Sequence, residues 1–467
     1  MPGLGTRPLG MGPDARLMPG LFEKFHTLRR RRAHNRAARP RPSGHHHDRW
    51  FWAIIVGAVA IVLAAYFWFT SARLLAEPIR IDYGPTDPSF ANAMGPMTGA
   101  DFTTGNRITT YENGDGFFPP MLAAIRGAQK TITLETYIWS TGHISNLFIE
   151  ALSERARAGV KVHALLDGMG GLKLHHADRE RLRAAGVEFN IYGREHWWQV
   201  KPNINHRTHR KLLIVDGKIG FTGGMCIDDR WLGNAESRNV WRETQVRVEG
   251  PAVRQMQAVF AHNWMQTTAT LLLGEDYFPP LEKAGTSIAH CYKSGPGEGP
   301  QAARLGYLFA IASARKSIDL AQAYFVPDDL AIEMLLAAIA RGVHVRVVVP
   351  AFNDSRFGRA ASRSRWGELL AAGAEFHLYQ PALFHCKSMV VDGVLLTIGS
   401  ANFDNRSFSI NDEVTLSVLD PKVAANNLEI FEDDIRHSKP LTREDFAGRP
   451  FYIKALDHIC GLFRSQF

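Results

Sequence analysis

Two stretches of this sequence decide its fold: HRKLLIVDGKIGFTGG at residues 209–224 and HCKSMVVDGVLLTIGS at residues 385–400. Both stretches have the spacing His-x-Lys-x4-Asp, and a pair of small residues follows each aspartate at the same distance. One such spacing of His, Lys and Asp is expected by chance only about 0.03 times in a chain of this length. Two of them, placed alike, therefore indicate a structural unit that occurs twice.

The segments around these two stretches repeat as well. Three further pairs have similar sequences in the same order: residues 131–140 with 317–327, 151–168 with 334–350, and 183–192 with 371–379. Near-continuous apolar runs at residues 160–166 and 343–349 are typical of buried strands, and each follows an expected helix that ends in Ala-Gly or Arg-Gly. The sequence therefore predicts an α/β fold of two repeated domains related by pseudo-twofold symmetry. We place these domains at residues 105–275 and 276–467, after a linker at residues 70–104.

The histidines and lysines of the two stretches can act together. Positions i and i+2 of an extended strand point to the same face, so His209 projects with Lys211, and His385 with Lys387. Such a set suits phosphodiester chemistry without a metal or cofactor, because the lysines stabilise the charge on the phosphoryl oxygens. One imidazole attacks phosphorus to form a phosphohistidine, and the other protonates the departing oxygen. We therefore expect the two imidazoles to titrate apart near neutral pH.

The remaining motif residues are also candidates for the site. Asp216 and Asp392 complete the two triples, but simple alternation places them on the opposite face from the lysines. Bracing of the strand and turn is therefore a better interpretation for both aspartates than contact with a substrate. The small residues, Gly223 and Gly224 in the first copy and Ser400 in the second, suit a close approach between the backbone and a ligand.

These motifs resemble the phospholipase D superfamily, including Asn402 in the segment GSAN. Three further stretches resemble its bacterial cardiolipin synthase branch: WRETQVRVEGPAV at 241–253, AYFVPDDL at 323–330 and NFDNRSFSINDEVTL at 402–416. The resemblance covers roughly residues 105–435. It implies two phospholipase D-like domains that transfer a phosphatidyl group from one phosphatidylglycerol to another and release glycerol.

The resemblance also implies roles for particular residues. By position, His209 is the nucleophile and His385 is the general acid and base. The family uses a downstream acid to orient each imidazole, and Glu243 and Glu413 occupy aligned places in the two repeats. Two exposed glutamates at strand edges are the alternative interpretation. Asn402 is expected to bind the substrate phosphate together with the small residues.

Cysteine usage adds one departure from the family pattern. Cys226 stands in the first copy where the pattern has an asparagine, and a thiol is a poor replacement for an amide donor. The chain has only four cysteines and no pair in CxxC spacing, so neither a disulfide scaffold nor a cysteine zinc site is expected.

Residues 50–69, WFWAIIVGAVAIVLAAYFWF, form a stretch without any charged side chain. A helix of this length spans about 30 Å, which matches the hydrocarbon core of a bilayer. Aromatic residues gather at both of its ends, where their rings favour the headgroup level. We therefore expect one transmembrane helix here; a buried core helix and a cleaved signal peptide are the alternatives.

The charges on either side of this stretch predict its orientation. Residues 30–49 contain seven arginines and residues 70–89 contain two, so the positive-inside rule places the N-terminus in the cytoplasm. The body is then expected on the periplasmic or outer side of a bacterial cell (inner) membrane. Residues 1–49 are rich in Arg, Pro, Gly and Ala, which predicts a basic, disordered tail.

The distribution of charge also bears on partners. The net charge of +8 lies entirely in residues 1–49, so residues 50–467 are formally neutral. A protein that binds nucleic acid through its phosphates usually carries the surplus on its folded domain. We therefore expect no nucleic acid partner. The resemblance implies a phospholipid substrate, the apolar stretch at residues 50–69 predicts the bilayer as a partner, and the oligomeric state stays open.

An insertion breaks the symmetry of the repeats just before the first motif. Residues 193–205, GREHWWQVKPNIN, have no counterpart in the second copy and contain Trp197 and Trp198. Indole rings suit the boundary between water and acyl chains, so one hypothesis is a loop that dips toward the membrane and guides the lipid. The alternative is that both indoles pack onto the domain.

Four functions are compatible with the motifs. The first is a membrane-anchored phosphatidyltransferase that makes cardiolipin, and the second is a phospholipase D that uses water as the acceptor. A nuclease of the same fold is disfavoured by the neutral body and the apolar span. A scaffold without catalysis is disfavoured because both His-Lys pairs are intact. The motif alone does not separate the transferase from the hydrolase, since that choice depends on pocket shape and water exclusion.

Overall fold

The computed structural model describes residues 45–69, 75, 77–193, 205–296, 301–463 and 466. It divides into two compact units, Met1–Ser71 and Ala72–Phe467. The predicted tail up to residue 44 and the predicted loop with Trp197 and Trp198 lie outside the described residues.

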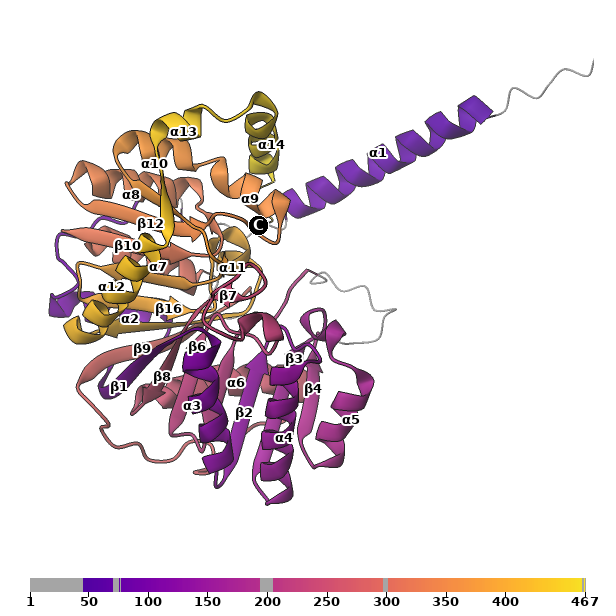
Figure 1. The fold of residues 1–467 in the computed structure, drawn as a ribbon, viewed down its shortest axis with the longest axis vertical. Helices are drawn as coiled ribbons and strands as arrows, with labels where there is room; N and C mark the ends of the chain where they lie inside the picture. The colour runs from indigo at the N-terminus through magenta and orange to yellow at the C-terminus, as the bar shows by residue number, and fades with distance from the viewer. Residues whose placement is uncertain are drawn as a thin grey trace, which may run out of the picture. The chain divides into compact units, whose positions relative to one another are not determined.

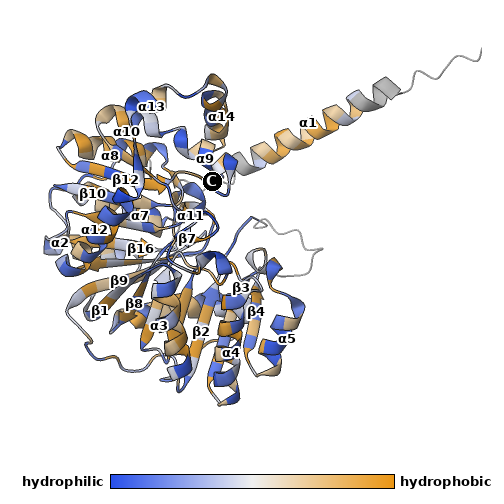
Figure 2. Cartoon of the chain, viewed as in Figure 1, coloured by the Kyte–Doolittle hydropathy of each residue, from blue (hydrophilic) through white to orange (hydrophobic). Residues whose placement is uncertain are grey.

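The described part of the first unit is one helix, α1 (His45–Phe69), which contains the predicted span. Ile54, Val56 and Ile61 in this helix have exposed side chains. The orange colour of its central turns in Figure 2 marks their high hydropathy. Within the described part of the chain, no helix is both long enough and apolar enough to cross a membrane.

The first repeat builds one half of a long mixed sheet in the second unit. Its parallel strands are β2 (Thr131–Thr136), β3 (Lys161–Asp167) and β4 (Glu188–Tyr192), connected by the helices α4 (His143–Arg157) and α5 (His176–Ala184). Antiparallel strands continue the sheet: β5 (Leu212–Val215), β6 (Ile219–Gly223), β8 (Thr244–Glu249) and β1 (Thr103–Glu112).

The second repeat builds the other half in the same way. Its parallel strands are β10 (Ser317–Gln322), β12 (His344–Pro350) and β13 (Glu375–Tyr379). Its antiparallel strands are β15 (Lys387–Val391), β16 (Leu395–Gly399), β18 (Glu413–Leu419), β9 (Ser287–Ser294) and the edge strand β19 (Ser438–Leu441). The predicted buried runs are thus β3 and β12, and each follows a left-handed glycine, Gly159 or Gly342, that ends the preceding helix.

The two halves meet where β1 pairs with β9, so all fifteen strands form one sheet. Read outward from that junction, the strand order of the first repeat corresponds to that of the second (Figure 1). This arrangement confirms the predicted α/β fold with a unit that occurs twice.

Helices cover both faces of the sheet and create cores that cross the predicted domain boundary. On one face, α6 (Ala252–Thr268) and α12 (Pro421–Arg436) cover strands of both repeats and share one apolar core. On the other face, α3 (Asn113–Gly127) packs with α4, while α7 (Ala302–Ser313), α8 (Asp329–Ala340) and α10 (Trp366–Ala372) cover the second repeat. The two repeats are therefore joined into one unit by a continuous sheet and a shared core.

The segment predicted as a linker at residues 70–104 is partly folded. It contains α2 (Pro88–Thr98), whose Phe90 and Met94 are fully buried in the core of the second repeat against α7. Part of the predicted linker is therefore folded, because its two large apolar side chains are buried in the core of the second repeat.

Short elements complete the second unit. The helical ones are η1 (Gly170–Lys173), η2 (Asp229–Trp231), α9 (Arg356–Arg363), α11 (Asn405–Ser409), α13 (Arg443–Ala447) and α14 (Phe451–Leu462). The extended ones are β7 (Trp241–Arg242), β11 (Phe325–Val326), β14 (Leu383–Phe384) and β17 (Phe403–Asp404). Because β14 pairs with β7, the two repeats are also linked at the ends of the strands that carry the motifs.

Candidate active site

Each motif histidine is held by the backbone of the other repeat. The N–H of His209, which precedes β5, donates to the carbonyl of Asp412 at 2.9 Å. The N–H of His385, which precedes β15, donates to the carbonyl of Arg242 at 2.8 Å. The pairing of β14 with β7 fixes the second of these contacts, so the site is built where the two repeats meet.

Each imidazole also contacts a buried glutamate of the other repeat, and these two contacts are here called crossed. Nδ1 of His209 lies 2.9 Å from Oε1 of Glu413, and Nδ1 of His385 lies 2.6 Å from Oε2 of Glu243. Both carboxylates are fully buried, which excludes the interpretation of two exposed glutamates at strand edges. The structure therefore brings Glu243 and Glu413 to the histidines, as the sequence predicts.

The small residues make room for these carboxylates. The hydroxyl of Ser400 donates to Oε2 of Glu413. At the equivalent place in the first repeat, a Cβ on Gly224 would overlap the carboxylate of Glu243, and one on Gly223 would overlap the side-chain amide of Gln245. The sequence predicts that a ligand approaches here, but protein side chains occupy the space; Gly224 and Ser400 therefore act through the glutamates, and Gly223 makes room for Gln245.

Each motif lysine lies next to the histidine two residues before it, as the i and i+2 spacing predicts. Nζ of Lys211 donates to the carbonyl of His209 at 2.6 Å, and Nζ of Lys387 makes the same contact with His385. Nζ of Lys387 also lies 3.1 and 3.2 Å from the two ring nitrogens of His385. Both lysines are buried, so their charges act over short distances in a poorly solvated site.

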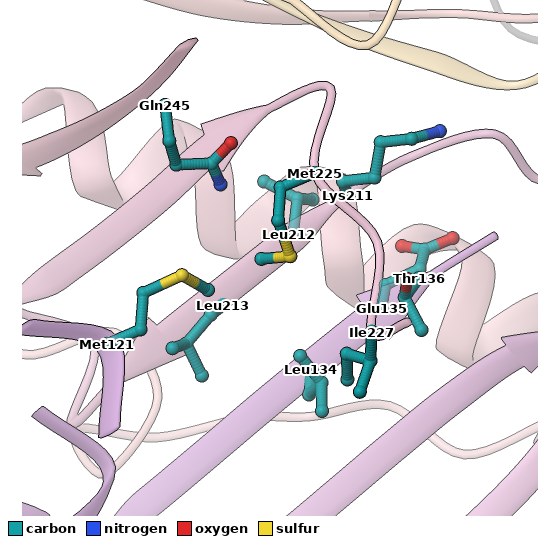
Figure 3. Close-up of a pocket in the computed structure, with 10 residues that line it drawn as sticks. All are labelled: Met121, Leu134, Glu135, Thr136, Lys211, Leu212, Leu213, Met225, Ile227 and Gln245. Carbon is teal, nitrogen blue, oxygen red and sulfur yellow. The ribbon is translucent and has the colours of Figure 1, made fainter. Parts of the chain in front are cut away.

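A small pocket lies beside Lys211 (Figure 3). Its lining is mostly apolar and includes Met121, Leu213 and Met225, and the ammonium group of Lys211 points away from these side chains. This lining does not suit a phosphate. The pocket is better explained as apolar packing around the stem of Lys211, whose ammonium group donates to the carbonyl of His209.

The pair of His209 and Glu413 has the charge distribution that a nucleophile needs. Burial lowers the pKa of His209 to about 4, and Lys211 contributes in the same direction against the effect of Glu413. Burial alone would raise the pKa of Glu413, but His209, Lys211 and Ser400 outweigh it and the pKa is lowered. An ionised carboxylate only accepts hydrogen bonds, so Nδ1–H of His209 donates to Glu413 and Nε2 keeps its lone pair.

The pair of His385 and Glu243 differs in its carboxylate. Burial, followed by the charge of Lys387, lowers the pKa of His385 well below its usual value. Burial raises the pKa of Glu243 to about 7 despite the opposing charge of Lys387, whose own pKa is lowered to about 8 by burial. The sequence predicts that the two imidazoles differ in pKa, but the pKa of both rings is lowered. The difference is therefore not found in the rings. It is found in the glutamates, because the pair with Glu243 retains a proton near neutral pH and Glu413 does not.

Asp216 and Asp392 do not approach the histidines. Asp216 accepts hydrogen bonds from the backbone N–H groups of residues 129–131, and Asp392 accepts the same three from residues 315–317. Both aspartates adopt left-handed backbone angles, with φ of 52° and 54°. Their inclusion among the catalytic candidates is therefore corrected: they brace the turns before β2 and β10.

Asn402 and its counterpart Cys226 have different surroundings. The side-chain oxygen of Asn402 is buried and has no hydrogen-bond partner among the described residues, while the backbone N–H donates to the hydroxyl of Ser407. Cys226 is a free cysteine that packs in the apolar core of the first repeat. Among the described residues, the side-chain oxygen of Asn402 is thus an unused hydrogen-bond acceptor, whereas the first repeat has a thiol at the equivalent position.

Aromatic residues that the sequence analysis did not select surround both imidazoles. The ring centroid of Tyr137 lies 5.1 Å from that of His209, and the rings of Trp231 and Trp241 lie 5.3 and 4.9 Å from His385. In the second repeat, Ala323 occupies the place of Tyr137, and Tyr324 follows it with its hydroxyl donating to Asp354 at 2.5 Å. The aromatic residues near the imidazoles therefore do not match between the repeats, so aligning the repeats gives no signal for them.

Metal ligands are a separate question. In the described ranges, no group of three or more His, Cys, Asp or Glu side chains is arranged to hold a metal ion.

The fold and the site define a class of protein: a two-repeat α/β enzyme with paired His-Lys motifs for phosphodiester chemistry. A family described as "Cardiolipin synthase, PLD-like domain" matches residues 121–264 and 307–435. The cardiolipin synthase of Geobacillus kaustophilus is 35% identical over 359 residues, which are 76% of this chain and 72% of that protein. Cardiolipin synthase 2 of Staphylococcus epidermidis is 32% identical over 365 residues, 78% of this chain and 75% of that protein.

The chain therefore belongs to the cardiolipin synthase family with phospholipase D-like domains, and it is a phosphatidyltransferase enzyme of that superfamily. A solved structure, the phosphatidylserine synthase of Haemophilus influenzae Rd KW20, superposes with a TM-score of 0.62 over 81% of this chain and 100% of that chain. At 13% sequence identity this likeness concerns the fold alone.

Proposed function

We propose that the enzyme makes cardiolipin from two molecules of phosphatidylglycerol and releases glycerol, by way of a phosphohistidine on His209. The observation that carries this proposal is the pair of crossed His-Glu contacts with unequal carboxylates. One imidazole is held neutral with a free lone pair, and the other belongs to a pair that stores one proton. These are the two states that a double displacement requires.

In the first step, Nε2 of His209 attacks the phosphorus of the donor lipid. A bond between nitrogen and phosphorus forms, and the bond from phosphorus to the glycerol oxygen breaks. The proton of the His385 and Glu243 pair passes to that oxygen, so glycerol leaves as a neutral molecule. Glu413 stabilises the positive charge that develops on His209.

In the second step, the acceptor is a free hydroxyl on the glycerol headgroup of another phosphatidylglycerol. It gives its proton to the pair of His385 and Glu243 while its oxygen attacks phosphorus. The bond to His209 breaks and the nitrogen recovers its lone pair. The enzyme thereby returns to its starting state, and the product carries two phosphatidyl groups on one glycerol.

Fixed charges support both steps. Lys211 and Lys387 lie beneath the imidazoles and stabilise the negative charge on the phosphoryl oxygens. The side-chain NH2 group of Asn402, two residues after Ser400 in the segment GSAN, is proposed to donate to one of those oxygens. Gly224 and Ser400 contribute indirectly by letting the glutamates reach the rings.

Attachment to the membrane is a further part of the proposal. The apolar sequence at residues 50–69, the exposed apolar side chains of α1 and a lipid substrate support an anchor with a cytoplasmic N-terminus and a body outside the cell membrane. A cysteine introduced at Glu444 on α13 tests this topology, because the native cysteines of the body are buried. Labelling of intact spheroplasts by an impermeant maleimide supports the anchor, and labelling only after lysis contradicts it.

The reaction is tested with phosphatidylglycerol labelled in its acyl chains, presented in detergent micelles and analysed by thin-layer chromatography. Cardiolipin, together with one glycerol per cardiolipin in the aqueous phase, is the expected result. Phosphatidic acid without cardiolipin would identify the alternative, a hydrolase of the phospholipase D type. The His209→Asn variant is the matched control and should form neither product.

A further inference from the structure

The C-terminal helix α14 (Phe451–Leu462) has its polarity reversed relative to an ordinary surface helix. Helices of soluble proteins bury an apolar stripe and expose their charged residues. In α14 the buried residues are Asp457, Cys460 and Gly461, and large apolar residues face outward. This distribution needs an explanation that the reaction does not supply.

The inner face of α14 is held on the protein by polar contacts. Asp457 accepts hydrogen bonds from Arg363 of α9 at 2.7 Å and from Arg449 at 2.6 Å. A Cβ on Gly461 would come within 2.9 Å of the hydroxyl of Ser364, so the two segments are in close contact. The buried ion pairs fix which side of α14 faces the protein, and its apolar side is left open.

The outer face of α14, the following Phe463 and the start of α9 carry exposed large apolar side chains. Phe451 is 85% exposed and Leu462 is 67% exposed, and α9 adds Phe357 at 63%. The exposed large apolar residues of α9, of α14 and of the residue after α14 are here called the α14 face: Phe357, Phe451, Tyr452, Leu456, Ile459, Leu462 and Phe463. Figure 2 shows α14 beside α9 at the end of the second repeat.

The charges near the α14 face favour one kind of partner. Over their described lengths, α9 and α14 contain one carboxylate, Asp457, and it is buried in its ion pairs. Arg356 and Lys454 are exposed cations on the same two helices. Aromatic and aliphatic side chains with flanking cations suit the boundary of an anionic bilayer.

The position of the α14 face connects it to the active site. Helix α9 begins two residues after Asp354, whose carboxylate receives the hydroxyl of Tyr324. Ala323, the residue before Tyr324, donates its N–H to the carbonyl of Cys386, and Cys386 follows His385 in the sequence. A short chain of contacts therefore connects the start of α9 to the backbone next to His385.

We propose that the α14 face is a membrane-docking surface by which the catalytic unit itself binds an anionic phospholipid bilayer. Phe451, Tyr452, Leu462 and Phe463 enter the boundary of the acyl chains, while Arg356 and Lys454 contact lipid phosphates. The choice of phosphatidylglycerol as the anionic lipid rests on the proposed function, but docking does not require turnover. Docking by α14 is separate from an anchor at residues 50–69, because it places the catalytic unit on the lipid surface.

The direct test measures the depth of a spin label on the full-length protein in vesicles of phosphatidylglycerol and phosphatidylcholine. Leu456→Cys carries the label on the α14 face, and Glu444→Cys on α13 is the matched control; the described native cysteines are buried. Docking predicts that the label at 456 becomes accessible to oxygen and shielded from a water-soluble nickel complex, whereas the label at 444 stays aqueous. An aqueous label at 456 would overturn the proposal. Spin-spin broadening at 456 in dilute vesicles would also overturn it, because a second copy of the chain would then cover the face.

A kinetic test separates docking from the chemistry. The Ile459→Ser and Leu462→Ser double variant should raise KM for phosphatidylglycerol in vesicles about tenfold and leave kcat on a soluble short-chain analogue unchanged. The Lys454→Ala variant should raise the vesicle KM at low ionic strength and have a smaller effect at high salt, because salt screens the contact between Lys454 and the lipid phosphates. Equal losses on vesicles and on the short-chain analogue would contradict docking. Formation of phosphatidic acid instead of cardiolipin would contradict the proposed reaction and leave both docking measurements valid.

Discussion

Nδ1 of His209 lies 2.9 Å from a carboxylate oxygen of Glu413, a residue that enters the site from the other repeat. The equivalent contact runs the opposite way, from His385 to Glu243 at 2.6 Å. Neither repeat therefore contains a complete His-Glu pair of its own. The continuous sheet and the paired strands β7 and β14 hold the two halves in the register that these contacts need.

The crossed contacts predict different effects for the two glutamates. Glu413→Gln removes the charge that stabilises the imidazolium of His209, so formation of the covalent intermediate should slow by about 10²-fold or more. Glu243→Gln removes the group that stores a proton for His385, so it should slow departure of glycerol. Rapid-quench single-turnover rates with phosphatidylglycerol and with a p-nitrophenyl phosphatidyl ester measure both effects.

The p-nitrophenyl ester distinguishes them, since its leaving group needs no proton. Glu243→Gln should recover most of its adduct-forming rate on this ester, and Glu413→Gln should not. The exposed Glu154→Gln on α4 serves as a control for loss of a carboxylate alone. If both site variants recover equally, the assignment of distinct roles to the two pairs is wrong.

The histidines themselves give the second prediction. His209→Asn should abolish turnover and leave no covalent lipid on the protein, because the attacking nitrogen is gone. His385→Asn should form an adduct with the p-nitrophenyl ester but release it very slowly, because no base activates the acceptor. Acid quench and mass spectrometry locate the phosphoryl group, and an adduct on His385 would reverse the assignment.

The pH dependence of kcat/KM is the third prediction. The pKa of His209 is lowered to about 4, so this imidazole is neutral and nucleophilic at all higher pH values. The pKa of Glu243 is raised to about 7, so its pair with His385 holds the required proton below that pH and loses it as the pH rises. Activity should therefore have an acidic limb near 4 and an alkaline limb near 7.

The alkaline limb should belong to Glu243. In the Glu243→Gln variant, the residual rate measured over the same pH range should no longer fall near pH 7. A limb of unchanged position in that variant would assign the titration to another group, such as Lys387, whose pKa is lowered to about 8.

Much of this site could be predicted from the sequence because its signals are local. The spacing of His209 and Lys211 places both on one side of the chain, and the repeat of that spacing at His385 identifies the second half. Alternation along the strand also indicated that Asp216 braces a turn, which its three backbone contacts confirm.

The crossing of the glutamates could not be predicted in this way. The repeat aligns Glu243 with Glu413 but does not say which imidazole each one contacts, since that depends on how β7 and β14 pair across the repeats. The burial of α2 could not be predicted for the same reason, because Phe90 packs in a core formed by residues more than two hundred positions later. Local patterns indicate faces and spacings, whereas contacts between distant segments follow from the assembled sheet.

The role of Asp216 and Asp392 gives the fourth prediction. Each accepts three backbone N–H groups, two exposed and one part-buried, so an alanine removes three hydrogen bonds and should destabilise the fold by about 1–3 kcal/mol. The left-handed backbone at both positions adds to this cost, because alanine tolerates it less well than aspartate. Asp216→Ala should therefore lower the melting temperature while the folded fraction keeps its adduct-forming rate. A normal melting temperature with a lost rate would place the aspartate in the chemistry instead.

Gly224 gives the last prediction, because it stands where the second repeat has Ser400. A Cβ at Gly224 would overlap the carboxylate of Glu243, so Gly224→Ala should push that carboxylate away from His385. Glycerol would then leave without its proton donor, and turnover of phosphatidylglycerol should fall, with much smaller loss on the p-nitrophenyl ester. Ser400→Ala is the matched variant: it removes a donor to Glu413, so it should slow both substrates alike. A melting curve for Gly224→Ala checks that the fold is intact, and equal losses on both substrates in that variant would show that Gly224 does not act through Glu243.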